Sequence, residues 1–190
     1  MPSVLEQQNA IQAHIRNFFK AEDFKVFSWG LGGIKDSLPF FRVMRLKQGD
    51  NWVYVSNGAS TIQKGGNYGC EFVLVSPRED PLLVELLAMV AHFQSAPEHR
   101  FIDVGNYVKI GRPWLGASAC TNLLVSLPYP YGPDLEWLHL DKSQHVRFTW
   151  LVPITDDEAK HAAEKGIDAL EALFEKTGLA YLDIDRDSVV

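Results

Sequence analysis

Hydrophobic residues recur at helical spacing in three parts of the chain. The first part is residues 3–20, and the second is residues 82–93, where apolar residues lie almost all round the helix. The third runs from Thr155 to Gly178. The pattern therefore predicts an amphipathic opening helix, a middle helix covered on more than one side, and one long closing helix.

Two of these helices begin with the sequence of a capping box. Ser3 is followed three residues later by Glu6, and Thr155 is followed in the same way by Glu158. The closing helix has acidic residues in its first turn, where they favour the positive end of the helix dipole. Its predicted buried stripe consists of Ala159, Ala163, Ile167, Leu170, Leu173 and Phe174.

Between the helices, short runs rich in Val, Phe and Trp are separated by Gly, Asp, Asn and Ser, as in strands joined by turns. Asp183 and Asp185 also follow strand alternation near the end of the chain. The composition shows no linker or repeat. We therefore expect residues 1–190 to form one α+β domain with a largely antiparallel, mixed sheet flanked by helices at the start, middle and end of the chain. The predicted strands are 24–29, 40–46, 52–56, 70–76, 107–110, 120–127, 135–140 and 146–154.

The distribution of charge narrows the classes of partner. The net charge is −6, and residues 101–190 contain 14 acidic and 8 basic residues, whereas residues 1–100 contain 10 of each. A nucleic-acid-binding protein needs clustered Lys and Arg, which this sequence lacks. An acidic half favours a basic protein partner, although acidic residues also simply solvate a surface helix.

The sequence contains neither a membrane-length apolar run nor a secretory signal, so we expect a cytoplasmic protein. Its two cysteines, Cys70 and Cys120, lie within apolar strand-like runs and are expected to be buried thiols. They lack the spacing of a redox or zinc motif.

One group of residues suggests a metal site. His139 and Asp141 share a strand face, and a hairpin would bring His145 opposite them. These residues could bind zinc or support hydrolysis, but no fourth ligand is evident, and polar residues are common at hairpin tips. Ser118 lies in a sequence close to a nucleophile elbow, but Cys120 replaces the second glycine, so a polar residue at a strand entry fits it better.

Aromatic residues and prolines gather in the second half of the chain. Prolines stiffen a loop before it binds, and Tyr and Trp provide contact area at low entropic cost. The same residues could instead fill a core beneath a rigid loop. The aromatic residues are Tyr107, Trp114, Tyr129, Tyr131 and Trp137. The candidate partner-binding set is Trp114, Tyr129, Tyr131, Asp134, Glu136 and Trp137.

The order of these elements resembles the Suppressor of Fused family in a compact, single-domain bacterial form. The strand Gly69–Val75 is similar to the G-x-E-[LF] strand of that family, and a Leu-rich helix follows Pro81. The resemblance continues through 123–127 and the Asp134-Leu135 segment. It ends with Phe148–Glu158, which looks like the family's strand and turn into the closing helix, so the similar region spans about 29–188.

This resemblance implies a non-enzymatic protein-binding module without a cofactor. Bacterial relatives are associated with toxin systems, in which they are inferred to act as immunity proteins. The partner would then be another protein, such as a basic toxin domain, with no role for nucleic acid or membrane. Two alternatives stay open: a metal-binding protein or hydrolase using His139, Asp141 and His145, and a structural subunit or homodimer.

Overall fold

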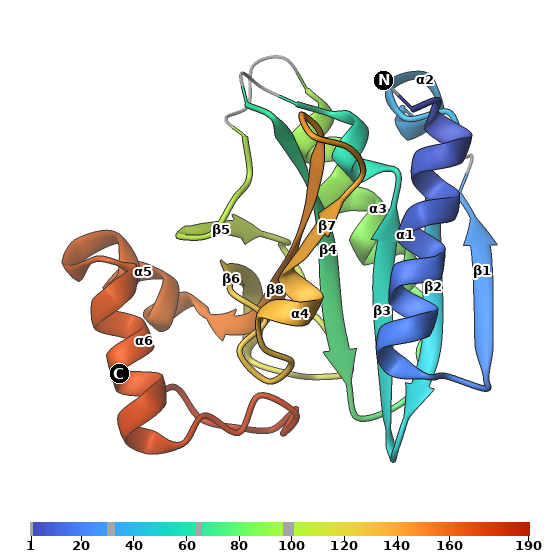
Figure 1. Cartoon of the computed structure of the whole chain (residues 1–190). Helices are drawn as coiled ribbons and strands as arrows, with labels where there is room; N and C mark the ends of the chain where they lie inside the picture. The colour runs from blue at the N-terminus through green and yellow to red at the C-terminus, as the bar shows by residue number, and fades with distance from the viewer. Residues whose placement is uncertain (1, 30–32, 64–65, 97–100) are drawn as a thin grey trace.

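A mixed β-sheet forms the centre of the molecule, with helices on both of its faces (Figure 1). The computed structural model describes residues 2–29, 33–63, 66–96 and 101–190. The helices are α1 (Val4–Phe19), α2 (Ile34–Ser37), the 3₁₀ turn η1 (Ala59–Thr61), α3 (Leu82–Ser95), α4 (Pro133–Glu136), α5 (Asp156–Lys165) and α6 (Ile167–Thr177). The strands are β1 (Phe24–Ser28), β2 (Arg42–Gln48), β3 (Asn51–Asn57), β4 (Tyr68–Ser76), β5 (Asn106–Lys109), β6 (Cys120–Ser126), β7 (Trp137–His139) and β8 (His145–Thr155).

The strand order is β1-β2-β3-β4-β8-β6-β5, and β7 pairs with β8 as a hairpin. Strands β4 and β8 run parallel, from Tyr68 opposite His145 to Val73 opposite Trp150. The other pairings between the described strands are antiparallel. The predicted α+β domain with a largely antiparallel, mixed sheet is therefore confirmed.

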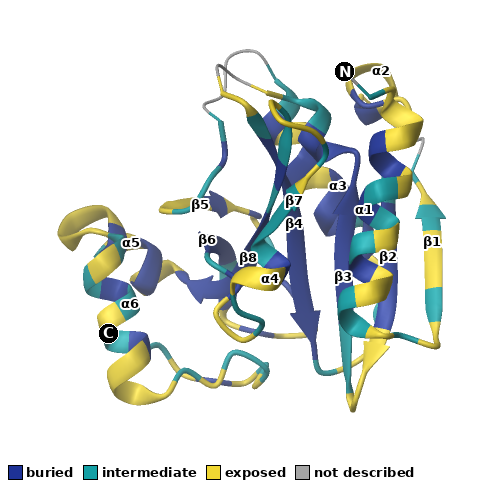
Figure 2. Ribbon diagram, viewed as in Figure 1, coloured by how far each residue is buried: buried dark blue, intermediate teal, exposed yellow. Residues whose placement is uncertain are grey.

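The central strands are apolar on both faces because each face is covered (Figure 2). In β4, Phe72 and Leu74 pack with α3, whereas Val73 and Val75 pack on the opposite face with α1. The second face is also covered by α5 and α6. Successive strand residues thus serve two hydrophobic clusters, as the two-residue period of a strand requires.

Helix α1 begins with the predicted capping box between Ser3 and Glu6. Two polar side chains of this helix, Gln7 and Gln8, are buried, and Gln8 donates hydrogen bonds to the carbonyls of Phe40 and Asn57, at 2.6 and 3.2 Å. The Asn57 side-chain amide donates in return to the Gln8 carbonyl, at 3.1 Å. Gln8 therefore joins the helix to the end of β3 at a point where apolar packing would leave backbone groups unpaired.

The prediction of one long closing helix was wrong. Gly166 adopts φ 93° and ψ 157°, a conformation that favours glycine, and it separates α5 from α6. Helix α5 buries the face that carries Glu158, Ala159 and Ala162, so Ala163 is exposed, although the sequence assigned it to the buried stripe. The Thr155–Glu158 capping box is present as predicted.

Three strand predictions also needed correction. The strand expected at Leu135 begins at Trp137, because Pro133 starts a helical turn that includes Leu135. The strand expected at Phe40 begins at Arg42. Residues 181–187, which include Asp183 and Asp185, form turns and no strand.

Both cysteines are buried and free, as predicted. Among the described residues, no helix has both the length and the apolar character needed to cross a bilayer.

Candidate partner-binding surface

The segment before α4 forms a tight turn that presents its residues at the surface. The backbone N–H groups of Tyr131 and Gly132 donate to the Pro128 carbonyl, at 2.9 and 3.1 Å. Gly132 has φ 72°, after which Pro133 starts α4. These two hydrogen bonds and the positive φ of Gly132 leave the backbone of residues 128–132 few other conformations.

The predicted binding residues differ in exposure: two are exposed, one is buried, and Tyr131, Glu136 and Trp137 are half-buried. Tyr129 is 62% exposed, and Asp134 is exposed at the start of α4. Trp114, in contrast, is 1% exposed and packs in the cluster beneath α3, so it is not part of any surface. It fills the core because its bulky side chain, held by a loop, covers the apolar sheet face.

Tyr131 is half-buried and contributes mainly to packing. Its ring contacts Phe18 and Phe19 edge-to-face, with centroid distances of 6.1 and 5.1 Å. Its hydroxyl donates to the Gln48 amide oxygen at 3.1 Å, and burial raises the pKa of this hydroxyl. Tyr131 thus fixes the turn against α1 and leaves neighbouring residues free for contact.

Glu136 and Trp137 lie in one cluster with three residues that were not among the predicted site residues: Tyr68, Asp103 and Arg147. The Arg147 guanidinium donates to Glu136 Oε1 from Nε at 2.9 Å and to Asp103 Oδ1 from Nη1 at 3.0 Å. It also lies 5.3 Å from the centroid of the Trp137 ring. Tyr68 donates its hydroxyl hydrogen to Asp103 and contacts Trp137 edge-to-face at 5.4 Å. We call Tyr68, Asp103, Glu136, Trp137 and Arg147 the Trp137 surface.

The hydrogen bonds of the Trp137 surface hold its charges in place. Burial by itself would lower the pKa of Arg147, but the Glu136 hydrogen bond and the charge of Asp103 outweigh it and raise that pKa. The hydrogen bond to Asp103, followed by burial, raises the pKa of the Tyr68 hydroxyl. Two carboxylates therefore hold one guanidinium beside a Trp ring, with each charged side chain 15–21% exposed and with little rotamer freedom to lose on binding.

Of these three residues, Arg147 could have been predicted from the sequence. Trp137 and Arg147 are cross-strand partners in the β7–β8 hairpin, which the hydrophobic pattern predicted. The register of that hairpin would have placed Arg147 beside Trp137. Tyr68 and Asp103 had no such signal, because they come from distant parts of the chain.

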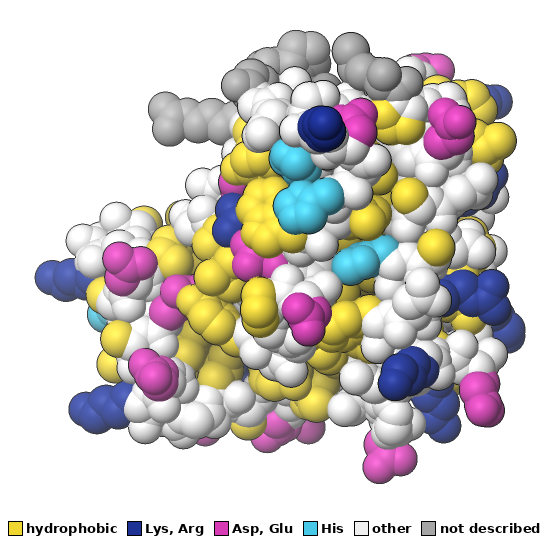
Figure 3. Space-filling model, in the orientation of Figure 1, with side chains coloured by type: hydrophobic (Ala, Val, Ile, Leu, Met, Phe, Trp, Pro, Cys, Tyr) yellow, Lys and Arg dark blue, Asp and Glu magenta, His cyan; other side chains and the backbone are white. Residues whose placement is uncertain are grey.

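The predicted pairing of His139 and His145 across the hairpin is present, with 2.9 Å between their Nδ1 atoms. Histidine side chains are visible over this hairpin in Figure 3. Asp141 stabilises the hairpin turn, because its Oδ1 accepts from the N–H groups of Ser143 and Gln144 at 2.7 and 2.8 Å. Across 2–29, 33–63, 66–96 and 101–190, no three His, Cys, Asp or Glu side chains are arranged to hold a metal ion.

Ser118 is buried beside a strand entry, as expected. Its hydroxyl oxygen accepts from the Cys120 N–H at 3.2 Å, which caps the start of β6. The geometry of Ser118 thus serves the local backbone.

A comparison with family models matches residues 35–187 to "Suppressor of fused protein (SUFU)". The chain belongs to the SUFU family. A search of the curated proteins found no match.

The solved structures agree with this assignment. A protein described as a SUFU homologue from Neisseria gonorrhoeae is 38% identical, with a TM-score of 0.87 and 98% of each chain covered. The structure of the Sufu–Fu complex matches at 18% identity and a TM-score of 0.71, covering 96% of this chain and 92% of the other. Drosophila Suppressor of Fused matches at 19% identity and a TM-score of 0.70, covering 97% of this chain and 51% of that one. The last two show that the SUFU fold is shared.

Within the SUFU-like strand Gly69–Val75, Glu71 has a structural role. Glu71 is fully buried and accepts hydrogen bonds from the Gly58 and Ser60 N–H groups, at 2.8 and 3.0 Å, and from the hydroxyls of Ser56 and Ser60. Burial raises the pKa of Glu71, and these hydrogen bonds oppose that shift. This carboxylate therefore organises the 3₁₀ turn after β3 and belongs to the scaffold.

Proposed function

We propose that this SUFU-family chain is a non-enzymatic protein-binding module that acts as an immunity protein against a basic toxin. The observation that best supports it is the Trp137 surface, where Trp, Tyr and Arg side chains lie together in fixed positions. These residue types are the ones most enriched among side chains that dominate protein interfaces. Family membership adds support, since the Sufu of the Sufu–Fu complex is bound to a protein.

The proposed contact area consists of the Trp137 surface together with Tyr129 and Asp134. The 14 acidic residues among 101–190 support a partner of opposite charge, because such complementarity speeds encounter and excludes acidic competitors. The proposed location is the cytoplasm, where thiols such as Cys70 and Cys120 stay reduced.

The first test is affinity capture from the native cell at low and at moderate salt, followed by reconstitution with the purified partner. We expect a basic protein whose complex weakens as salt rises. Co-expression with this chain should then restore growth to cells that produce the partner. A captured protein that is acidic, or one that is not toxic, would contradict the immunity role.

The second test locates the contact. The Tyr129→Ala/Trp137→Ala variant should bind the purified partner at least about tenfold more weakly, which corresponds to about 1.4 kcal/mol. Phe40→Ala is the matched control, because Phe40 is 61% exposed, close to the 62% of Tyr129, and lies outside the proposed contact area. Equal binding by both variants would exclude this surface.

A further inference from the structure

A groove of about 560 Å³ lies between helix α6 and the face of strands β6 and β8. Its floor consists of two cross-strand pairs, Leu124 with Val152 and Ser126 with Trp150. All four side chains are buried, with exposed fractions between 0 and 6%, so the accessible apolar surface of the groove lies on its walls. Figure 3 shows hydrophobic side chains between the lobe of α5 and α6 and the centre of the molecule, with acidic side chains beside them.

The walls of the groove include three aromatic residues and Leu179. Phe174 comes from α6, and Tyr181 from the following segment contacts Trp150 edge-to-face at a centroid distance of 4.8 Å. Tyr129 stands at the rim with 62% of its surface exposed. Apolar and aromatic side chains of this kind favour binding of apolar groups with little loss of side-chain entropy.

One rim of the groove is acidic. Asp168, Glu171 and Glu175 follow at intervals of three and four residues, so they form a stripe along one face of α6. Glu171 is held toward the floor by the Ser126 hydroxyl, which donates to it at 2.6 Å. The described residues that line the groove include no Lys, Arg or His.

The negative charge of this stripe also acts on Tyr129. Burial raises the pKa of the Tyr129 hydroxyl, and the charges of Glu171, Asp168 and Glu175 raise it further. Apolar walls beside an acidic rim select a ligand that has both apolar and cationic groups. Along α6 the stripe spans about 10 Å, or two helical turns.

We propose that this groove binds a basic amphipathic segment of a partner protein, with its apolar side chains against Tyr129, Leu179 and Tyr181 and its Lys or Arg side chains along the acidic stripe. The inference rests on the proposed function, because it names the part of a protein partner that this chain would receive. Helix-in-groove recognition uses the same combination of an apolar face and flanking charges.

The test is an NMR titration of the full chain with a synthetic peptide of about three helical turns built of Leu and Lys at helical spacing. We expect shifts of the Trp150 indole N–H and of α6 amides. A Leu/Glu peptide of the same pattern and a Lys/Ser peptide without an apolar face should leave these signals unchanged. No binding of the Leu/Lys peptide, or equal binding of the Lys/Ser peptide, would overturn the proposal.

Two matched variants make the test specific. Ala172→Lys/Glu175→Lys adds positive charge at the groove, and it should weaken binding of the Leu/Lys peptide about tenfold. Ala163→Lys/Glu164→Lys makes the same change on exposed positions of α5 that do not line the groove, and binding should be unchanged. Equal loss in both variants would show a general charge effect and contradict the groove.

Failure of this inference can be separated from failure of the proposed function. If the purified partner binds the wild-type chain and Ala172→Lys/Glu175→Lys equally well, the groove proposal is wrong and the proposed function stands. If no protein partner is captured, the proposed function is wrong, and the peptide titration still decides whether the groove binds a basic segment.

Discussion

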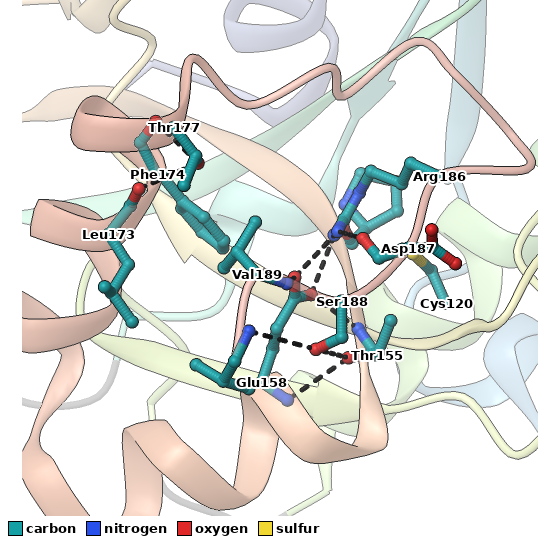
Figure 4. A network of polar contacts seen from close by, with 12 residues as sticks. Cys120, Thr155, Glu158, Leu173, Phe174, Thr177, Arg186, Asp187, Ser188 and Val189 are labelled. Carbon is teal, nitrogen blue, oxygen red and sulfur yellow. Dashed lines mark hydrogen bonds and ion pairs between the residues drawn. The ribbon is translucent and has the colours of Figure 1, made fainter.

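The guanidinium of Arg186 pairs with the carboxylate of Glu158 in the interior, with Nη1–Oε1 and Nη2–Oε2 distances of 2.7 Å each (Figure 4). The Glu158 side chain is 0% exposed and that of Arg186 is 6% exposed. Glu158 also accepts from the N–H groups of Thr155, at 2.8 Å, and Val189, at 3.1 Å. The carboxylate that caps α5 thus also holds the C-terminal segment against the domain.

Removing one partner of this pair should strongly destabilise the fold. Arg186→Met would leave the Glu158 carboxylate buried without its counter-charge, and we expect the free energy of unfolding to fall by about 3–5 kcal/mol. The double variant Glu158→Gln/Arg186→Met removes both charges and should recover part of that loss. Urea denaturation at neutral pH measures both effects, and a single variant as stable as wild type would contradict a buried pair.

The same pair predicts a dependence of stability on pH. Burial opposes ionisation of Glu158, but Arg186 and the backbone N–H groups outweigh it, so the pKa of Glu158 is lowered in the folded chain. Its contribution is therefore fully present above the unfolded value of about 4.3 and is lost as pH falls through the lower folded value. Thermal melts between neutral pH and about pH 3 should show a steeper acid loss for wild type than for Glu158→Gln/Arg186→Met. Parallel curves would contradict this assignment.

Gly166→Ala distinguishes a broken helix from a continuous one. In a single helix, alanine would be favourable relative to glycine by about 0.5–1 kcal/mol. At φ 93°, alanine is strained instead, and we expect it to lower the free energy of unfolding by about 1 kcal/mol or more. Chemical denaturation decides by the sign of the change, because a stabilised variant would indicate that α5 and α6 form one helix.

Gly69→Ala should be among the most damaging small substitutions. A Cβ atom at Gly69 would lie 2.0 Å from the Ser60 carbonyl oxygen, which cannot move without disrupting the turn that Glu71 organises. We expect a loss of about 3 kcal/mol or more. Gly66→Ala is the control, since the nearest atoms to its Cβ lie 3.9 Å away. Similar melting temperatures for the two variants would contradict this close approach.

Trp114 and Tyr129 should respond to alanine in opposite ways. Trp114→Ala removes a buried ring and should cost about 3–5 kcal/mol of stability. Tyr129→Ala should change stability by no more than about 0.5 kcal/mol and act on partner binding instead. Denaturation and a binding assay on each variant test this separation, which fails if Tyr129→Ala unfolds the chain.

Sequence patterns were sufficient to predict the elements that depend only on residues close together in the chain. Helix α1 and the start of α5 follow from apolar spacing and capping boxes, which act within one or two turns. The β7–β8 hairpin follows from two apolar runs around a polar turn. The choice of Glu136 and Trp137 as candidate binding residues, beside a rigid proline turn, also came from local sequence and stays a prediction.

The burial of Trp114, the Trp137 surface and the groove could not be predicted in this way, because they depend on contacts between segments that are distant in the sequence. Nothing near Trp114 in the sequence distinguishes a core ring from a surface ring, because its burial is due to α3 and the sheet folding over it. The Trp137 surface needs Asp103 and Arg147, which are 44 residues apart, and the groove needs β6, β8 and α6 to meet. Such juxtapositions arise from the strand order and from the parallel pairing of β4 with β8, which hydrophobic periodicity does not encode. The sequence thus specifies which segments are helices and strands and where the negative charge lies, whereas packing decides which side chains stay exposed for a partner.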